Sequence, residues 1–115
     1  MLTFKIILQR FLQQFKQTLS SSYLHLDVEF ESNGSFCPPL IQLINDEELI
    51  FHYLELDTHK TIESYNINSV DVAFLTSKIL EMIKTYSLIP IEIRIFEEDG
   101  ISFNECKINS LINIE

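Results

Sequence analysis

The chain has 115 residues, which is the length of one domain, and we expect residues 1–115 to fold as a single unit. Its 17 acidic residues against 8 Lys and Arg give a net charge of −9. That charge argues against non-specific binding to nucleic acid, which depends on cationic contacts to phosphates. With 2 glycines and 3 prolines the chain is not collagen-like or low-complexity, and no apolar run approaches the ~20 residues of a membrane span.

Residues 2–19 carry apolar side chains at intervals of three and four, which is the spacing of one helical face. This stripe comprises Phe4, Ile7, Leu8, Phe11, Leu12, Phe15 and Leu19. The segment holds Lys5, Arg10 and Lys16, and the first acid of the chain comes only at Asp27. We interpret it as a docked first helix. An acid-free amphipathic start is also typical of a transit peptide or of a helix on a membrane surface.

Residues 23–31 alternate strictly between apolar and polar side chains, which predicts a half-buried strand. The apolar side comprises Leu24, Leu26, Val28 and Phe30, and the polar side comprises Tyr23, His25, Asp27, Glu29 and Glu31.

Three further strands are expected before the next helix. Residues 40–44 form a short apolar run, residues 49–56 are apolar on both faces as in a central strand, and residues 61–67 form a weaker strand. We expect the Cys-Pro-Pro sequence at 37–39 to lie outside any central strand, because proline lacks the N–H that the ladder requires.

A second helix follows, with Asn68 or Ser69 as its expected cap, Asp71 in its first turn, and Pro90 preventing its continuation. Its apolar stripe comprises Val72, Leu75, Ile79, Met82 and Tyr86, with Ala73, Leu80 and Ile83 beside it.

The C-terminal part predicts a hairpin that turns at Asp99-Gly100, a dipeptide that tolerates the positive φ of a type I′ turn. In its first strand Ile89, Ile91, Ile93 and Ile95 alternate with Glu92, Arg94 and Phe96. A two-residue turn pairs Phe96 with Phe103, Arg94 with Glu105, Glu92 with Lys107, Ile93 with Cys106, and Ile91 with Ile108. The chain is therefore expected to be α+β, with two helices and an antiparallel or mixed sheet of about five to six strands in the order α-β-β-β-β-α-β-β.

Motifs for familiar chemistry are missing: there is no glycine-rich phosphate loop, no Cys-x-x-Cys pair and no His-Glu-x-x-His. We expect no catalytic residue, no metal and no organic cofactor. Cys37 and Cys106 are interpreted as free thiols in a reducing cytosol. One alternative stays open for the strand at 23–31, because its histidine and three acids at intervals of two could hold a divalent ion; a solvated or partner-contacting face gives the same pattern.

Charge is the feature that points to a function. The 43 residues between Lys16 and Lys60 contain eight acids and no Lys or Arg. An acidic surface can serve solubility alone, or it can accelerate and select the binding of a basic partner. We expect a small acidic cytoplasmic protein of bacterial immunity type, an inhibitor that neutralises a basic protein such as a nuclease toxin. A secretion or assembly chaperone-like module and a small enzyme without a recognisable motif are the alternatives.

The expected docking surface is a set of turn carboxylates, comprising Glu47, Glu48, Glu97, Glu98 and Asp99. The second choice is the polar side of the strand at 23–31, comprising Tyr23, His25, Asp27, Glu29 and Glu31. No nucleic-acid or membrane partner is expected, and the sequence does not indicate an oligomeric state.

Overall fold

The computed structural model of the chain describes most of the backbone. Within the sheet it describes side chains at residues 25–31, 65–66, 89–97 and 104–107. The described residues are 2–18, 24–32, 35–44, 48–55, 58–66, 69–97, 102–109 and 112–115, with the backbone alone at 18, 24, 32, 35–44, 48–55, 58–64 and 102–103. These residues form an α+β fold with two helices and an antiparallel sheet, which confirms the expected fold class.

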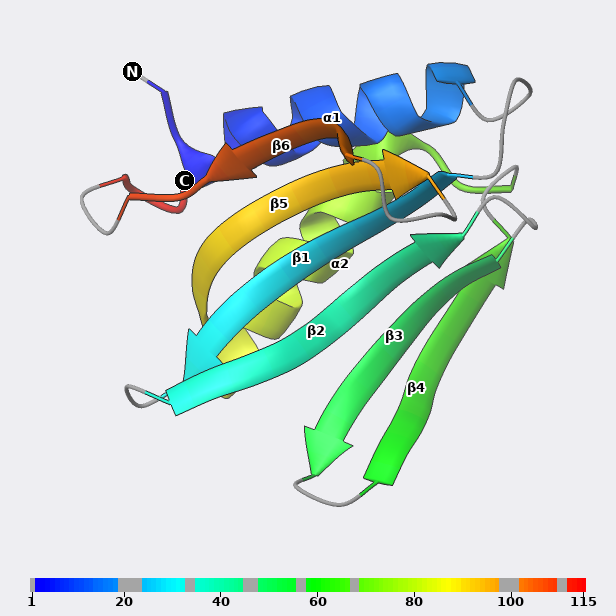
Figure 1. Cartoon of the computed structure of the whole chain (residues 1–115). Coiled ribbons are helices and arrows are strands. Elements are labelled where there is room, and N and C mark those ends of the chain that lie inside the picture. The colour runs from blue at the N-terminus through cyan, green and yellow to red at the C-terminus, as the bar shows by residue number, and fades with distance from the viewer. Residues whose placement is uncertain are drawn as a thin grey trace.

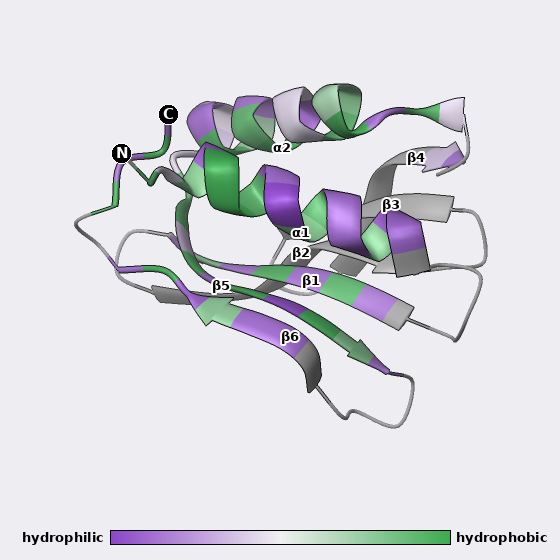
Figure 2. Ribbon diagram, turned by 90° about the horizontal axis from the view of Figure 1, so that it is seen from above, coloured by the Kyte–Doolittle hydropathy of each residue, from purple (hydrophilic) through white to green (hydrophobic). Residues whose placement is uncertain are grey.

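The helices lie together on one face of the sheet (Figures 1 and 2). They are α1 (Phe4–Thr18) and α2 (Val72–Tyr86). The strands are β1 (Leu24–Ser32), β2 (Ser35–Ile44), β3 (Glu48–Glu55), β4 (Thr58–Asn66), β5 (Ile89–Glu97) and β6 (Ser102–Lys107). The backbone places them in one sheet in the order β4-β3-β2-β1-β5-β6, with every neighbouring pair antiparallel.

The core lies between the helices and the middle of the sheet. In β1 and β5, Leu26 is opposite Ile95 and Val28 is opposite Ile93, and all four side chains are fully buried. The helices complete this core with Phe4, Ile7, Leu8, Phe11, Leu12 and Phe15 from α1, and Leu75, Thr76, Ile79, Leu80, Met82 and Ile83 from α2. The apolar stripe expected in α1 is therefore confirmed from its first to its last described member.

The C-terminal segment, residues 112–115, caps the N-terminus of α1. The N–H of Phe4 donates to the carbonyl of Asn113, and that of Lys5 to the carbonyl of Ile114, both at 2.9 Å. The Thr3 hydroxyl accepts the N–H three residues later at 3.3 Å. The first N–H groups of a helix have no partner within the helix, so these three acceptors satisfy them. The two ends of the chain accordingly lie close together in Figures 1 and 2.

Helix α2 begins differently from the prediction and ends before Pro90 as expected, and one member of its expected stripe is exposed. Asp71 is its N-cap, accepting the N–H of Phe74 at 2.8 Å, so the expected cap at Asn68 or Ser69 is wrong. Both an Asn and an Asp can cap, and the acid expected inside the first turn takes that role instead. Tyr86 is 38% exposed and not part of the packed stripe, because it is the last residue of the helix.

The first residues of β5 depart from simple alternation. Pro90 is buried opposite Phe30, whereas Ile89 is 47% exposed. Between Pro90 and Glu92, Ile91 is an extra residue with no counterpart on β1, which is a β-bulge. The bulge reverses the side on which the earlier residues lie, so the expectation that Ile89 shares the side of Ile93 and Ile95 is wrong.

The two prolines of β2 also lie at an irregularity. Residues 38–40 together oppose the single Glu29 of β1, and β3 pairs with β2 only from Ile41 onward. Pro38 and Pro39 are therefore within an inner strand, contrary to the prediction. The rule behind the prediction still holds, because the prolines sit where regular ladder pairing is interrupted.

The C-terminal hairpin keeps most of its predicted register. The confirmed pairs are Glu92 with Lys107, Ile93 with Cys106, and Arg94 with Glu105. The pair of Phe96 with Phe103 is wrong, because the register shifts after Ile95 and Phe96 lies opposite Ser102. The turn at Asp99-Gly100 lies outside the described residues.

The core position of α2 predicts a stability experiment. Leu75 is 1% exposed and Ile79 is fully buried, so replacing either with alanine should lower the free energy of unfolding by about 2–5 kcal/mol. Urea denaturation measures the loss, and Lys84→Ala on the exposed side of the helix should change it by less than about 0.5 kcal/mol. Losses below about 1 kcal/mol at both core positions would contradict the packing described above.

The capping of α1 predicts the result of a second stability experiment. Removing residues 112–115 takes away two carbonyl acceptors and the packing of Ile112 and Ile114, so the free energy of unfolding should fall by at least about 1 kcal/mol. Hydrogen exchange at the amides of Phe4 and Lys5 should become faster. Glu115→Ala, which changes an exposed side chain and keeps both carbonyls, is the control. Unchanged exchange at the two amides after the truncation would show that the segment does not cap α1.

Candidate functional site

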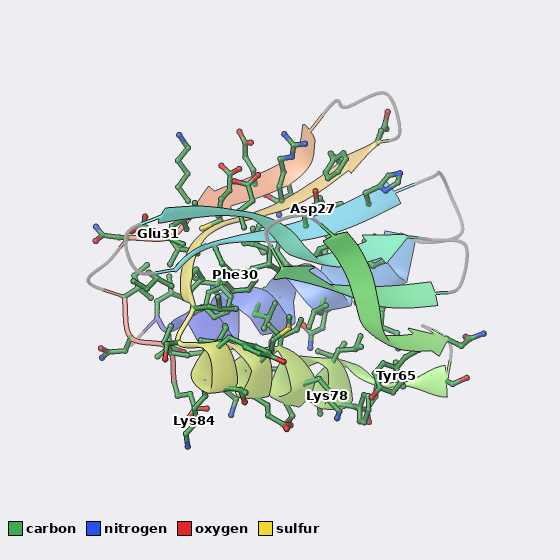
Figure 3. All side chains as sticks on the ribbon, turned by 90° about the horizontal axis from the view of Figure 1, so that it is seen from below. Asp27, Phe30, Glu31, Tyr65, Lys78 and Lys84 are labelled. Carbon is green, nitrogen blue, oxygen red and sulfur yellow. The ribbon has the colours of Figure 1, made fainter. Side chains whose placement is uncertain are left out.

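The polar side of β1 lies on the sheet face away from the helices. His25, Asp27, Glu29 and Glu31 are half-buried there, while the alternate residues are fully buried against the helices. Figure 3 shows Asp27 and Glu31 on the side opposite to Phe30, which points toward α1 and α2. The strand that the sequence predicted as a second-choice docking surface therefore has the expected buried apolar side and the expected polar side.

The neighbouring strands extend this row into a wider surface. Asp27 is opposite Arg94 of β5, which in turn is opposite Glu105 of β6. Glu29 is opposite Glu92. We call the side chains on this side of β1, β5 and β6 the open face; its members are His25, Asp27, Glu29, Glu31, Glu92, Arg94, Phe96, Glu105 and Lys107.

An aromatic stack occupies one end of the open face. The rings of His25 and Phe96 lie nearly parallel, at 13°, with their centroids 5.2 Å apart. The Arg94 guanidinium lies over the Phe96 ring, with its Cζ 4.2 Å from the ring centroid. Cross-strand aromatic pairs and cation–π contacts each hold side chains in one conformation. This end of the face therefore holds three side chains of β1 and β5 in contact with one another.

The charges of the two layers differ in sign. The open face holds five carboxylates and two cations among its described members. Helix α1 contains Lys5, Arg10 and Lys16 and no acid, and α2 contains Lys78 and Lys84 with a single acid, Glu81. In Figure 3 the labelled lysines of α2 lie on the far side of the helix layer from Asp27 and Glu31.

The predicted docking residues are thus divided. Four of them, His25, Asp27, Glu29 and Glu31, are brought together on the open face. Glu97 is half-buried opposite Leu24, and alternation along β5 places it on the helix side with Ile95, apart from the open face. Glu48 is the first residue of β3 and is paired with Ile44; only its backbone is among the described parts of the structure. Tyr23, Glu47, Glu98 and Asp99 lie outside the described residues.

Sequence reasoning missed the members of the open face on β5 and β6 as site residues. Their alternation and their hairpin register were readable, and they were interpreted only as pairs that stabilise the hairpin. What the sequence did not reveal is that β5 lies next to β1, because these strands are separated by about half of the chain. That adjacency brings Phe96 onto His25 and Arg94 next to Asp27.

The part of the chain that the structure describes gives little support to other kinds of site. No group of three or more His, Cys, Asp or Glu in it is placed to hold a metal ion. A shallow depression of about 460 Å³ lies between α1 and α2, lined by Gln13, Lys16, Gln17, Asp71, Val72 and Ala73. Its two charged side chains have structural partners, since Lys16 donates to the Val70 carbonyl and Asp71 caps α2.

Two further observations concern a cysteine and the helices. Cys106 is a free, half-buried thiol on β6. In the described part of the chain, neither helix combines the length and apolar character needed to cross a bilayer.

No model of a protein family, no curated protein and no solved structure matches this chain. The interpretation of the open face therefore depends on its own residues.

The aromatic stack predicts a measurable coupling. In a double-mutant cycle, His25→Ala and Phe96→Ala should show an interaction energy of about 0.5–1.5 kcal/mol in the free energy of unfolding, because each ring loses its partner when the other is removed. The matched control is a cycle of His25→Ala with Lys107→Ala, which lies on the same face beside a different part of β5. That control should be additive within about 0.5 kcal/mol. A coupling no larger than the control would show that the rings do not stack in solution.

Proposed function

We propose that this chain is a small acidic binding protein of the cytoplasm that inhibits a basic protein, as an immunity protein inhibits a bacterial nuclease toxin. In this proposal it acts by binding and has no catalytic role. The observation that carries the proposal is the open face, where five carboxylates from three adjacent strands lie on the same side of the sheet as a stack of His25, Phe96 and Arg94 at one end. This replaces the turn carboxylates as our first choice of docking surface.

The placement of the carboxylates suits recognition of cationic side chains. Cross-strand neighbours on an antiparallel sheet have Cβ atoms about 4.5–5.5 Å apart, and alternate residues along a strand lie about 6.6–7 Å apart. The row of Asp27, Glu29 and Glu31 therefore presents acids at a regular interval on a backbone that is fixed by its neighbours. Lysines or arginines of a partner can pair with several of them at once, and little conformational entropy of the sheet is lost.

The half-burial of this row adds to its value in binding. His25, Asp27, Glu29 and Glu31 are each partly shielded by the sheet, so a charge that approaches them is screened less by water than at a fully exposed loop. Arg and aromatic residues are the side chains most often responsible for binding energy at interfaces, and Arg94 and Phe96 stand at the edge of the acidic row.

The proposal predicts the effect of reversing charge at one end of the row. Glu29→Lys with Glu31→Lys should leave the fold intact and slow association with the basic partner by about tenfold, because electrostatic attraction accelerates encounter. The partner is obtained by capture on the immobilised chain at low salt and release at high salt. Association and dissociation rates are then measured by surface plasmon resonance over a range of ionic strength, and the difference between variant and native chain should shrink as salt rises.

The matched control carries the same change of charge away from the open face. Glu81→Lys with Glu115→Lys alters two exposed acids, one on α2 and one in the C-terminal segment, and should slow association much less. Equal effects of the two double variants would mean that only net charge matters, and the open face would then not be the docking surface. A third variant with lysine at Glu47, Glu48, Glu98 and Asp99 tests the turns. Slow association of that variant alone would return the docking surface to them.

A further inference from the structure

Resting on the function proposed above, we propose that Ile89 is an apolar contact residue of the same docking surface, and that the basic partner covers it with a large aliphatic side chain set beside its lysines or arginines. Ile89 is 47% exposed, and among the described large apolar side chains only Leu2, at 48%, is more exposed. Its position on the sheet places a chemical requirement on the partner that charge alone does not impose.

The pairing of β1 with β5 places Ile89 on the same side of the sheet as the open face. Residues directly opposite each other in an antiparallel pair have their side chains on one side of the sheet. Ile89 is opposite Glu31, and Figure 3 shows Glu31 on the side away from Phe30. Phe30 itself is opposite Pro90, and both are buried. Ile89 therefore extends the open face beside Glu31, at the end away from the aromatic stack.

The β-bulge in β5 is what gives Ile89 this position. With regular alternation it would lie on the helix side together with Ile93 and Ile95, which are fully buried. The extra residue Ile91 reverses its side, so an aliphatic side chain that alternation would assign to the core is turned outward. Bulges often re-aim side chains next to functional sites. The exposure of Ile89 is therefore the consequence of a specific backbone irregularity.

The acids of β1 at this end of the face have no cation directly opposite them. On β5, Glu31 is opposite Ile89 itself and Glu29 is opposite Glu92. On the other side, β2 contains no Lys, Arg or His in its sequence, so it supplies no cation whatever the direction of its side chains. This end of the open face therefore combines an exposed aliphatic side chain with carboxylates whose cross-strand positions hold no cation.

This combination defines the chemistry of the segment that covers it. Carboxylates attract lysines and arginines over a distance, and this attraction mainly accelerates encounter. An aliphatic side chain acts only on contact, where removing its surface from water slows dissociation. A segment that carries a leucine-like side chain among its cations uses both effects, whereas a purely cationic segment uses only the first. The occupant is therefore a basic protein segment with a large aliphatic residue beside its lysines or arginines.

Two synthetic peptides of equal charge test this requirement. Both have blocked ends; one is Leu-Thr-Arg-Thr-Arg-Thr-Leu, and the other has alanine in place of both leucines. Alternate residues of an extended peptide lie about 6.6–7 Å apart, which is also the interval between Glu29 and Glu31, and the symmetrical ends allow either chain direction. The native chain should bind the leucine peptide at least about fivefold more tightly, because only that peptide covers Ile89 with a large aliphatic side chain. NMR titration measures both dissociation constants.

Variants of the chain assign the preference to one side chain. Ile89→Ala keeps every charge and should bind the two peptides with dissociation constants within about twofold of each other. Its matched control is Leu2→Ala, which removes an equally exposed aliphatic side chain ahead of α1 and should keep the full preference. Glu29→Gln with Glu31→Gln should weaken the binding of both peptides by at least about tenfold, because the charge-assisted contacts are lost.

The outcomes separate this inference from the function on which it rests. Equal binding of the two peptides by the native chain, a preference that survives Ile89→Ala, or one that Leu2→Ala removes would overturn the role of Ile89 and leave the proposed function unaffected. Binding of neither peptide, or binding that Glu29→Gln with Glu31→Gln does not weaken, would overturn both.

The native chain decides alone if Ile89→Ala fails to fold. Nuclear Overhauser effects between the leucine methyl groups of the peptide and the methyl groups of Ile89 would then support the contact. Their absence in the saturated complex would overturn it.

Discussion

The antiparallel pairing of β1 with β5 is the constraint on which both faces of the sheet depend. It joins a strand near the N-terminus to one near the C-terminus and places Leu26 and Val28 beside Ile95 and Ile93, all fully buried under the helices. Side chains alternate along a strand, so the burial of one side fixes what the other side presents. A slip of one residue would expose the apolar set and bury the acids. The hydrophobic core therefore specifies the arrangement of the open face, although it shares no side chain with it.

Two irregularities of the sheet lie on either side of one residue of β1. On one side of Glu29, β2 carries three residues against one, and on the other side β5 carries an extra residue at Ile91. All three prolines of the chain, Pro38, Pro39 and Pro90, lie in these two irregular stretches. A proline cannot donate to the ladder, and a bulge leaves a residue without a regular partner, so the two occur together at low cost. Bulges also bend a strand, and β5 is strongly curved near its start in Figure 1.

Local patterns in the sequence predicted much of this fold, and long-range pairing was beyond them. The stripe of α1, the alternation in β1 and three pairs of the β5–β6 hairpin follow from spacing alone, because each depends on neighbours within a few residues. Where an extra residue interrupts the ladder, local patterns give the wrong answer. In β5 the extra residue Ile91 reverses the side of Ile89, which is exposed. In β6 a similar shift places Ser102 opposite Phe96 in place of the expected Phe103.

The candidate site was half predictable for the same reason. The acids of β1 were recognisable from their interval of two. The stack of Phe96 on His25 and the placement of Arg94 beside Asp27 require the adjacency of β1 and β5, which no local pattern contains. The helix layer carries more cations than acids, whereas the open face carries more acids than cations, so the two sides of the molecule differ in the sign of their described charges. In the proposed function, a basic partner would be repelled by the lysines and arginine of α1 and attracted by the carboxylates on the other side of the sheet. Both cations of the open face have acids as cross-strand neighbours, because Arg94 lies between Asp27 and Glu105 and Lys107 lies opposite Glu92. Among the described side chains of this face, Glu29 and Glu31 have no cation directly opposite on β5.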